Sequence, residues 1–153
     1  MKSFENKVAA ITGAGSGIGR ALALGLARQG CHVALSDVNS AGLKETAELV
    51  RKLGVKASEA LVNVADRDAV HAWADQVMAE YGQVNAIFNN AGVAQGGTVE
   101  GNDYADYEWV MSINFWGVVN GTKAFLPYLK STGEGHIVNT SSIFGLFAQP
   151  GMS

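Results

Sequence analysis

Short apolar runs alternate with longer amphipathic segments along all 153 residues of the chain. Apolar runs of about four to eight residues predict buried strands, and apolar residues recurring every three or four positions predict helices. The predicted strands span residues 7–12, 32–37, 55–62, 84–89 and 136–140. The predicted helices span residues 17–29, 41–53, 66–81 and 104–130. Regular alternation of strand and helix is typical of an α/β fold in which helices cover both faces of a doubly wound parallel sheet.

A glycine-rich turn joins the first predicted strand to the first predicted helix and contains Gly13, Gly17 and Gly19. Such a turn exposes backbone N–H groups and the positive end of a helix dipole, which together suit a diphosphate. Asp37 ends the second predicted strand, where a carboxylate can accept hydrogen bonds from a ribose. The pattern predicts a Rossmann-type dinucleotide-binding unit of which the sequence contains the first five strands and not the rest. A turn that serves packing alone, or an Asp37 that caps a helix or shapes a turn, is the structural alternative.

Composition and charge narrow the class of protein. Hydrophobic residues make up 48% and charged residues 16% of the chain, which is typical of a globular protein, and the length predicts one domain over residues 1–153. A net charge of −3 without a basic block argues against a nucleic-acid partner. The sequence has no apolar stretch of membrane-spanning length and no leader-like N-terminus, so we expect a cytoplasmic protein without membrane contact.

Cysteine and histidine usage predicts neither a disulfide nor a metal site. Cys31 is the single cysteine, so an internal disulfide is excluded, and we expect it to be a small buried residue rather than a reactive thiol. His32, His71 and His136 stand in separate segments without metal-ligand spacing.

Four motifs in order resemble those of the short-chain dehydrogenase/reductase family, and the resemblance covers the whole chain. They are Thr12-Gly13-x-x-x-Gly17-x-Gly19, Asn89-Asn90-Ala91-Gly92, Asn114 on the last predicted helix, and Ser142 after the last predicted strand. The resemblance implies hydride transfer between NAD or NADP and a secondary alcohol or ketone. It also implies a homo-oligomer, either a dimer or a tetramer.

The resemblance and the turn chemistry together assign the cofactor to one set of residues. Asn89 is expected to tie neighbouring strands together instead, and Asn63-Val64 departs from the Asp-Val common in the family, which weakens one contact to the adenine. The residues expected at the cofactor are Gly13, Ser16, Gly17, Ile18, Gly19, Asp37, Asn63, Val64, Asn90, Ala91 and Gly92.

Asp37 is expected to choose between the two cofactors. Its carboxylate can bind ribose hydroxyls and repels a 2′-phosphate, and no Arg or Lys stands at Ser16 or at residues 38–39 to neutralise that phosphate. We therefore expect NAD to be preferred, with NADP as the alternative.

Asn114 and Ser142 are the expected catalytic residues. Asn114 falls on an apolar helical face with Met111 and Val118, where an amide needs a hydrogen-bond partner. The resemblance implies that it holds a water in a proton relay; a satisfied core amide or a local helix distortion is the alternative. Ser142 is expected to orient the substrate oxygen.

The acid/base motif of the family, Tyr-x-x-x-Lys, is missing from the sequence. Eleven residues follow Ser142 and none is a tyrosine, so we expect this chain to be the N-terminal part of a longer enzyme and to be inactive alone. Two alternatives stay open: a module that binds or senses a dinucleotide without catalysis, and a methyltransferase that binds S-adenosylmethionine. The sequence does not identify the substrate.

Overall fold

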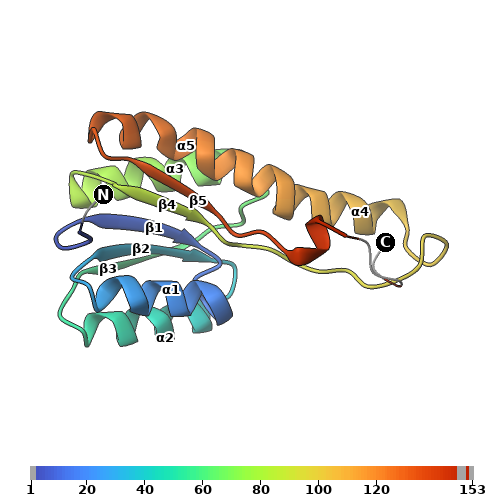
Figure 1. The fold of residues 1–153 in the computed structure, drawn as a ribbon, viewed down its shortest axis with the longest axis horizontal. Coiled ribbons are helices and arrows are strands. Elements are labelled where there is room, and N and C mark those ends of the chain that lie inside the picture. Colours follow the sequence, from blue (N-terminus) through green and yellow to red (C-terminus); the bar gives the residue numbers. More distant parts are fainter. Residues whose placement is uncertain (1–2, 148–150, 152–153) are drawn as a thin grey trace.

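Five parallel strands form one sheet in the order β3-β2-β1-β4-β5 (Figure 1). The computed structural model describes residues 3–147 and 151. From β1 the chain builds outward through β2 and β3, then crosses back to place β4 and β5 on the other side of β1. This reversal creates a switch point between β1 and β4, beyond whose carboxyl ends ligands bind in such sheets. The strands are β1 Val8–Thr12, β2 His32–Asp37, β3 Ala57–Leu61, β4 Ala86–Asn89 and β5 His136–Asn139.

Helices cover both faces of the sheet, so the predicted doubly wound α/β fold is confirmed. Helices α1 and α2 pack on one face, and α3 and α5 pack on the other (Figure 1). Alternate residues of β1 enter the two cores, with Ile11 on the α1 side and Ala10 on the α3 side. The helices are α1 Gly17–Ala27, α2 Ser40–Arg51, α3 Arg67–Tyr81, α4 Tyr104–Met111 and α5 Gly117–Ser131.

Side-chain caps set where two of the helices begin. Asn39 Oδ1 accepts a hydrogen bond from Gly42 N at 3.1 Å at the start of α2. Asp66 Oδ1 accepts from Ala69 N at 3.0 Å, so Asp66 is the cap of α3 and not its first residue. Each of these bonds satisfies one of the N–H groups that a helix start leaves without a partner.

The expected single helix over residues 104–130 is interrupted. A π-helical segment, Ser112–Trp116, separates α4 from α5, and Figure 1 shows α4 extending beyond the carboxyl ends of the strands. A π turn inserts about one extra residue, which rotates the face that follows. The buried face of α5 consequently consists of Gly117, Asn120, Gly121, Ala124, Phe125 and Leu129.

The predicted position of Asn114 on a buried apolar stripe is therefore wrong. Asn114 is exposed, and Met111 on the same predicted stripe is 50% exposed. The local helix distortion that was the structural alternative is what the structure contains. Sequence periodicity assumes a constant 3.6 residues per turn, and the π segment breaks that assumption.

Cys31 is fully buried at the entry to β2, and burial raises the pKa of its thiol from 9.0 to about 12. Between pH 9 and pH 12 the folded protein keeps this proton while the unfolded chain loses it. The contribution of the thiol to the free energy of unfolding is therefore fully present below pH 9 and falls as the pH rises toward 12. We expect the free energy of unfolding of the wild type to fall relative to Cys31→Ala by about 1.4 kcal/mol per pH unit above pH 9.

Urea denaturation of both proteins at pH 8, 9 and 10 measures this difference, because every other titrating group is common to the two. If the free energy of unfolding changed with pH in the same way for wild type and Cys31→Ala, the thiol would have the same pKa in the folded and unfolded states, which would contradict the prediction. Alkylation of the native wild type at pH 8 should also be slow, and fast once urea opens the fold.

In the part of the chain that the structure describes, no helix is both long and apolar enough to cross a membrane.

Candidate functional site

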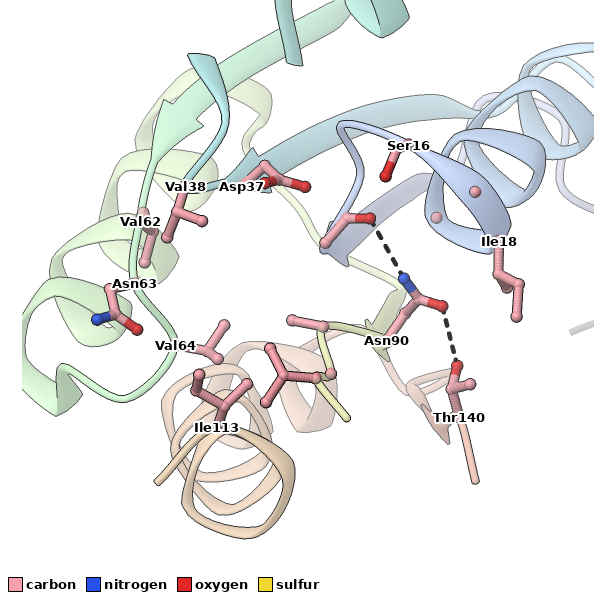
Figure 2. A pocket seen from close by; sticks show the side chains of 16 residues that line it. Ser16, Ile18, Asp37, Val38, Val62, Asn63, Val64, Asn90, Ile113 and Thr140 are labelled. Carbon is pink, nitrogen blue, oxygen red and sulfur yellow. Dashed lines mark hydrogen bonds between the residues drawn. The ribbon is translucent and has the colours of Figure 1, made fainter. Parts of the chain in front are cut away.

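A cleft of about 510 Å³ opens where the glycine turn after β1 meets the ends of the other four strands (Figure 2). Every residue that the sequence analysis assigned to a cofactor lines this cleft. Segments that are far apart in the chain thus meet at one edge of the sheet, as parallel strands require. The remaining lining residues are Val38, Val62, Val93, Ile113 and Thr140.

Steric contacts require glycine at Gly13 and Gly19, where the turn packs against its neighbours. Gly13 has φ +65°, and a Cβ there would lie 2.8 Å from Ala91 Cα. A Cβ on Gly19 would lie 2.1 Å from Gly13 O, so α1 packs directly onto the turn. Close packing at both glycines holds the turn, β1 and the loop after β4 in one rigid unit.

Gly17 leaves the turn open toward the cleft. A Cβ on Gly17 would meet no described atom within 4 Å, although Gly17 lines the cleft. Ser16 precedes α1 and, among the described residues, forms no side-chain capping bond. The first N–H groups of a helix have no intrahelical acceptor. The donors at this helix start therefore suit the oxygens of a diphosphate.

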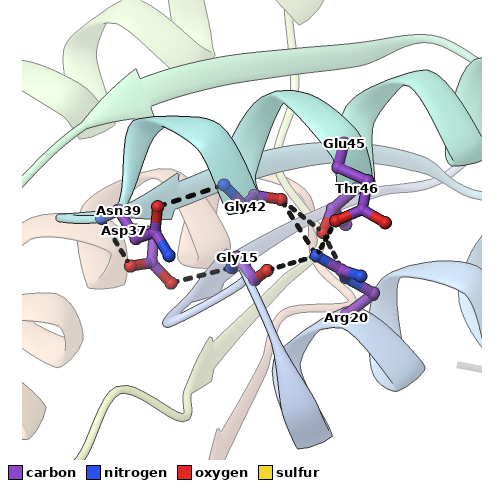
Figure 3. Close-up of polar contacts among 7 residues, drawn as sticks. All are labelled: Gly15, Arg20, Asp37, Asn39, Gly42, Glu45 and Thr46. Atoms are coloured by element: carbon purple, nitrogen blue, oxygen red, sulfur yellow. Dashed lines mark hydrogen bonds and ion pairs between the residues drawn. The ribbon is translucent and has the colours of Figure 1, made fainter.

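Asp37 connects the end of β2 to the glycine turn (Figure 3). Its Oδ2 accepts a hydrogen bond from Gly15 N at 2.7 Å, and its Oδ1 accepts from Asn39 N at 2.9 Å. Because Asn39 caps α2, the alternative in which Asp37 caps that helix is wrong, whereas its part in the turn is confirmed. A carboxylate can accept about four hydrogen bonds, so two acceptor sites remain for a ligand in the cleft.

Asn90 joins the ends of three strands at the floor of the cleft. Its Nδ2 donates to Thr12 O at 3.0 Å and to Gly13 O at 3.3 Å, while its Oδ1 accepts from Thr140 Oγ1 at 3.2 Å (Figure 2). Thr12 Oγ1 in turn accepts from Asn90 N and Ala91 N at 2.9 and 3.0 Å. The loop after β4 is thereby fixed against β1.

Asn89 ties strands together, as the sequence analysis expected. Its Nδ2 donates to Asn139 Oδ1 on β5 at 2.9 Å and to Thr122 Oγ1 on α5 at 3.1 Å. The side chain is buried, so these bonds satisfy the amide nitrogen, whereas Asn89 Oδ1 has no hydrogen-bond partner among the described residues.

The far end of the cleft combines apolar side chains with one amide. Val62 and Val64 are buried at the end of β3, and Figure 2 shows Ile113 beside Val64. Asn63 Oδ1 accepts from Ala65 N at 3.0 Å, so this exposed asparagine shapes a turn as well as lining the cleft. Apolar side chains of this kind suit an aromatic base.

Asn114 holds the loop after β4 through both atoms of its amide. Its Nδ2 donates to Val93 O at 2.8 Å, and its Oδ1 accepts from Val93 N at 2.9 Å. Asn114 lies outside the lining of the cleft, but the residue that it holds is part of that lining. One donor and one acceptor of the amide remain for a water or a further group.

We expect Asn114→Leu to loosen the loop at Val93, because the variant removes both hydrogen bonds. Exchange of the Val93 amide proton should accelerate by about tenfold, which corresponds to about 1.4 kcal/mol for bonds at an exposed site. Ser112→Ala is the matched control, since the Ser112 hydroxyl bonds only to Trp109 O within the same helical segment among the described contacts. Unchanged exchange in Asn114→Leu would contradict the role of the amide as a clamp.

Ser142, the other expected catalytic residue, lies outside the lining of the cleft. Its Oγ accepts from Phe144 N at 3.2 Å and starts the short 3-10 turn Ile143–Gly145. The hydroxyl is exposed and keeps its proton for donation to a ligand.

Over residues 3–147 and 151, no group of three or more His, Cys, Asp or Glu side chains is placed to hold a metal ion.

The sequence analysis missed some residues that line the cleft. Val38 and Val62 are direct neighbours of predicted residues, and Thr140 ends a predicted strand, so their positions could have indicated them. Ile113 had no such signal, because it reaches the cleft only through the π segment.

Comparisons with known proteins agree with this geometry. Residues 7–153 match the sequence profile of the short chain dehydrogenase family. The chain is 54% identical over 153 residues to the Mycobacterium tuberculosis protein SadH and covers 55% of it. It therefore spans about half the length of such relatives.

Two solved structures are also similar to the chain. One is a short chain dehydrogenase/reductase from Burkholderia phymatum in complex with NAD, with a TM-score of 0.96 and 39% identity over 99% of this chain and 54% of that one. The other is an NAD+-bound xylitol dehydrogenase, with a TM-score of 0.94 and 36% identity over 99% of this chain and 58% of that one. A family match over almost the whole chain and a site built from the motifs of that family agree, so the chain belongs to the short-chain dehydrogenase family.

Proposed function

We propose that the full-length protein is an NAD-dependent oxidoreductase that transfers a hydride between a secondary alcohol or ketone and the cofactor. One observation carries the proposal: the glycine turn, the Asp37 carboxylate and the loop after β4 line a single cleft at the switch point of the sheet. Similar solved structures that hold NAD support it. In this proposal, residues 1–153 belong to one dinucleotide-binding domain.

The residues of the cleft fit the parts of a dinucleotide in order. The helix start after Gly17 and the hydroxyl of Ser16 would bind the diphosphate, with Gly13 and Gly19 shaping the turn and Ile18 covering it. Asp37 would bind the adenosine ribose. The adenine would lie between residues 62–64 and Val38, and the backbone of Asn90-Ala91-Gly92 would line the path toward the nicotinamide.

NAD is proposed as the preferred cofactor because of the charge on Asp37. The two free acceptor sites of its carboxylate suit the two hydroxyls of a ribose, whereas a 2′-phosphate would meet a like charge. The cleft lining contains no Arg or Lys among the described residues to offset that repulsion. NADP binding is expected to be much weaker.

A dinucleotide bound in the cleft would supply the hydride acceptor for an alcohol or, when reduced, the hydride donor for a ketone. The Ser142 hydroxyl would donate a hydrogen bond to the substrate oxygen, without giving up its proton, and so orient that oxygen. Asn114 would hold Val93 at the cleft and, through its remaining donor and acceptor, a water in the proton relay. The family resemblance implies that a tyrosine and a lysine complete the relay.

Titration calorimetry of the full-length protein with NAD and with NADP, followed by assays with secondary alcohols and ketones, tests the proposal. Tight NAD binding with turnover of any such substrate is the expected result. Binding without turnover would favour a sensing module, and affinity for neither coenzyme would overturn the proposal. The methyltransferase alternative receives no support from the family match.

We also propose a cytoplasmic homo-oligomer, a dimer or tetramer, acting on a small molecule. The support is a set of large apolar side chains exposed on α4 and the π segment, because exposed apolar patches mark contact surfaces. Light scattering of the full-length protein should give a mass of at least two chains, and a monomer at micromolar concentration would contradict this. The exposed side chains are Trp109, Met111, Phe115 and Trp116.

A further inference from the structure

Arg20 lies on the opposite side of Gly15 from the Asp37 carboxylate (Figure 3). Its Nη2 donates to Gly15 O at 2.7 Å, while Gly15 N donates to Asp37 Oδ2, also at 2.7 Å. Two successive peptide groups of the glycine turn are thus held from both sides, one by a cation and one by an anion. Hydrogen bonds to ionised groups are short and stronger than those between neutral groups.

The guanidinium is itself held by α2. Arg20 Nη2 lies 2.7 Å from Glu45 Oε2, and Arg20 Nε donates to Thr46 Oγ1 at 2.9 Å. The Thr46 hydroxyl donates to Gly42 O at 3.0 Å and therefore presents a lone pair to Arg20. A planar guanidinium can make all these bonds at once in a fixed orientation, which the single nitrogen of a lysine does not match.

The same segment of α2 packs tightly on the glycine turn. A Cβ on Gly42 would lie 2.6 Å from Gly15 O, and a Cβ on Gly15 would lie 2.9 Å from Asp37 Oδ2. The Gly42 N–H is bonded to Asn39 Oδ1, and Asn39 N is bonded to Asp37. Because the Thr46 hydroxyl joins Gly42 O to Arg20, the contacts form a closed ring of Arg20, Gly15, Asp37, Asn39, Gly42 and Thr46.

We propose that Arg20 is a positioning residue for cofactor selectivity: by fixing Gly15, it sets the position of the Asp37 carboxylate that distinguishes a ribose from a ribose 2′-phosphate. This inference rests on the proposed function. The Arg20 side chain is only 26% exposed, and its charge is paired with Glu45, so it does not act as a phosphate-binding cation. It acts on the ligand through Gly15 and Asp37, without touching it.

Arg20→Met in the full-length protein is the decisive variant. Without the guanidinium, Gly15 is held on one side only, so we expect the Kd for NAD to rise about tenfold while that for NADP changes by less than about twofold. The NAD preference should therefore fall several-fold. Arg20→Lys should give an intermediate value, because the charge remains but a single nitrogen carries all the donors. Arg28→Met is the matched control, since Arg28 is exposed at the end of the same helix.

Exchange of the Gly15 amide proton, followed by NMR without cofactor, gives a second readout that a loss of global stability would not mimic. We expect it to accelerate in Arg20→Met more than the amides of the β1 core, and to be unchanged in Arg28→Met. Equal changes in the two Kd values, or an unchanged Gly15 exchange rate, would overturn the positioning role.

If Arg20→Met does not fold, Glu45→Gln tests the positioning role of Arg20 in its place. Glu45 is 60% exposed, so we expect the fold to tolerate this change. We expect it to lower the NAD preference about twofold to threefold, and an unchanged preference would overturn the inference. The proposed function fails separately: a wild type without affinity for either coenzyme overturns both. If the wild type prefers NAD and the variants keep the same ratio of Kd values for NAD and NADP, only the role of Arg20 is overturned.

Discussion

Gly19→Ala is expected to weaken dinucleotide binding strongly and to destabilise the fold. The new Cβ would lie 2.1 Å from Gly13 O and 2.8 Å from Asn90 Nδ2, so the carbonyl and the amide must both move. Moving them disturbs the turn that would hold the diphosphate and the bonds that hold the loop after β4. Overpacking of this kind costs about 3 kcal/mol, and we expect the affinity for NAD to fall by about 100-fold or more.

Gly25→Ala supplies the matched control on the same helix. A Cβ on Gly25 would meet no described atom within 4 Å, so the same substitution should stabilise α1 by about 0.5–1 kcal/mol. Thermal denaturation and NAD titration of both variants measure the contrast. Similar losses in Gly19→Ala and Gly25→Ala would mean that alanine is harmful anywhere in α1, and the steric argument would be wrong.

Asp37→Ser is expected to shift the cofactor preference from NAD toward NADP by about 1,000-fold. At a separation of about 4 Å near a protein surface, two unit charges interact by about 4 kcal/mol, so removing the carboxylate removes a large barrier to a 2′-phosphate. NAD binding should weaken at the same time, because the ribose loses its acceptor. The ratio of the two Kd values, measured by calorimetry on the full-length protein, reports both effects.

Two further variants distinguish the effect of the Asp37 charge from the effect of any negative charge near the cleft. Asp37→Asn keeps one oxygen for the turn but removes the charge, so its ratio should lie between those of the wild type and Asp37→Ser. Glu48→Gln removes an exposed negative charge from the neighbouring helix α2 and should leave the ratio unchanged. An unaltered ratio in Asp37→Ser would refute the role of the carboxylate in selectivity.

The order of strands and helices was readable from the sequence because it depends on local patterns. The run from Val8 to Thr12 is buried on both faces, as expected for a central parallel strand, and Gly82 ends α3 with φ +72°, which few other residues adopt readily. The turn at Gly13 and the carboxylate at Asp37 follow strands directly, so their place at one edge of the sheet followed from the fold class.

The last helix was predicted less well because its geometry is not periodic. The π segment over Ser112–Trp116 moved Asn114 from the expected buried stripe to an exposed position where it binds Val93. Neither the extra residue in that turn nor the partner of the amide is encoded in local spacing. The partner of the amide, Val93, lies 21 residues earlier in the chain, so only the fold brings the two residues together.

By itself, the sequence determined the α/β alternation, the glycine turn, most of the residues that line the cleft at the strand ends, and the resemblance to one family. Each of these depends on residue type and on distance along the chain. Only the tertiary structure decided that Arg20 holds the Gly15 carbonyl, that Asn39 rather than Asp37 caps α2, and that Thr140 reaches Asn90. These contacts depend on how α1 and α2 pack on the sheet and how β5 pairs with β4, because hydrogen bonds between separate elements form only where the fold brings donor and acceptor within reach.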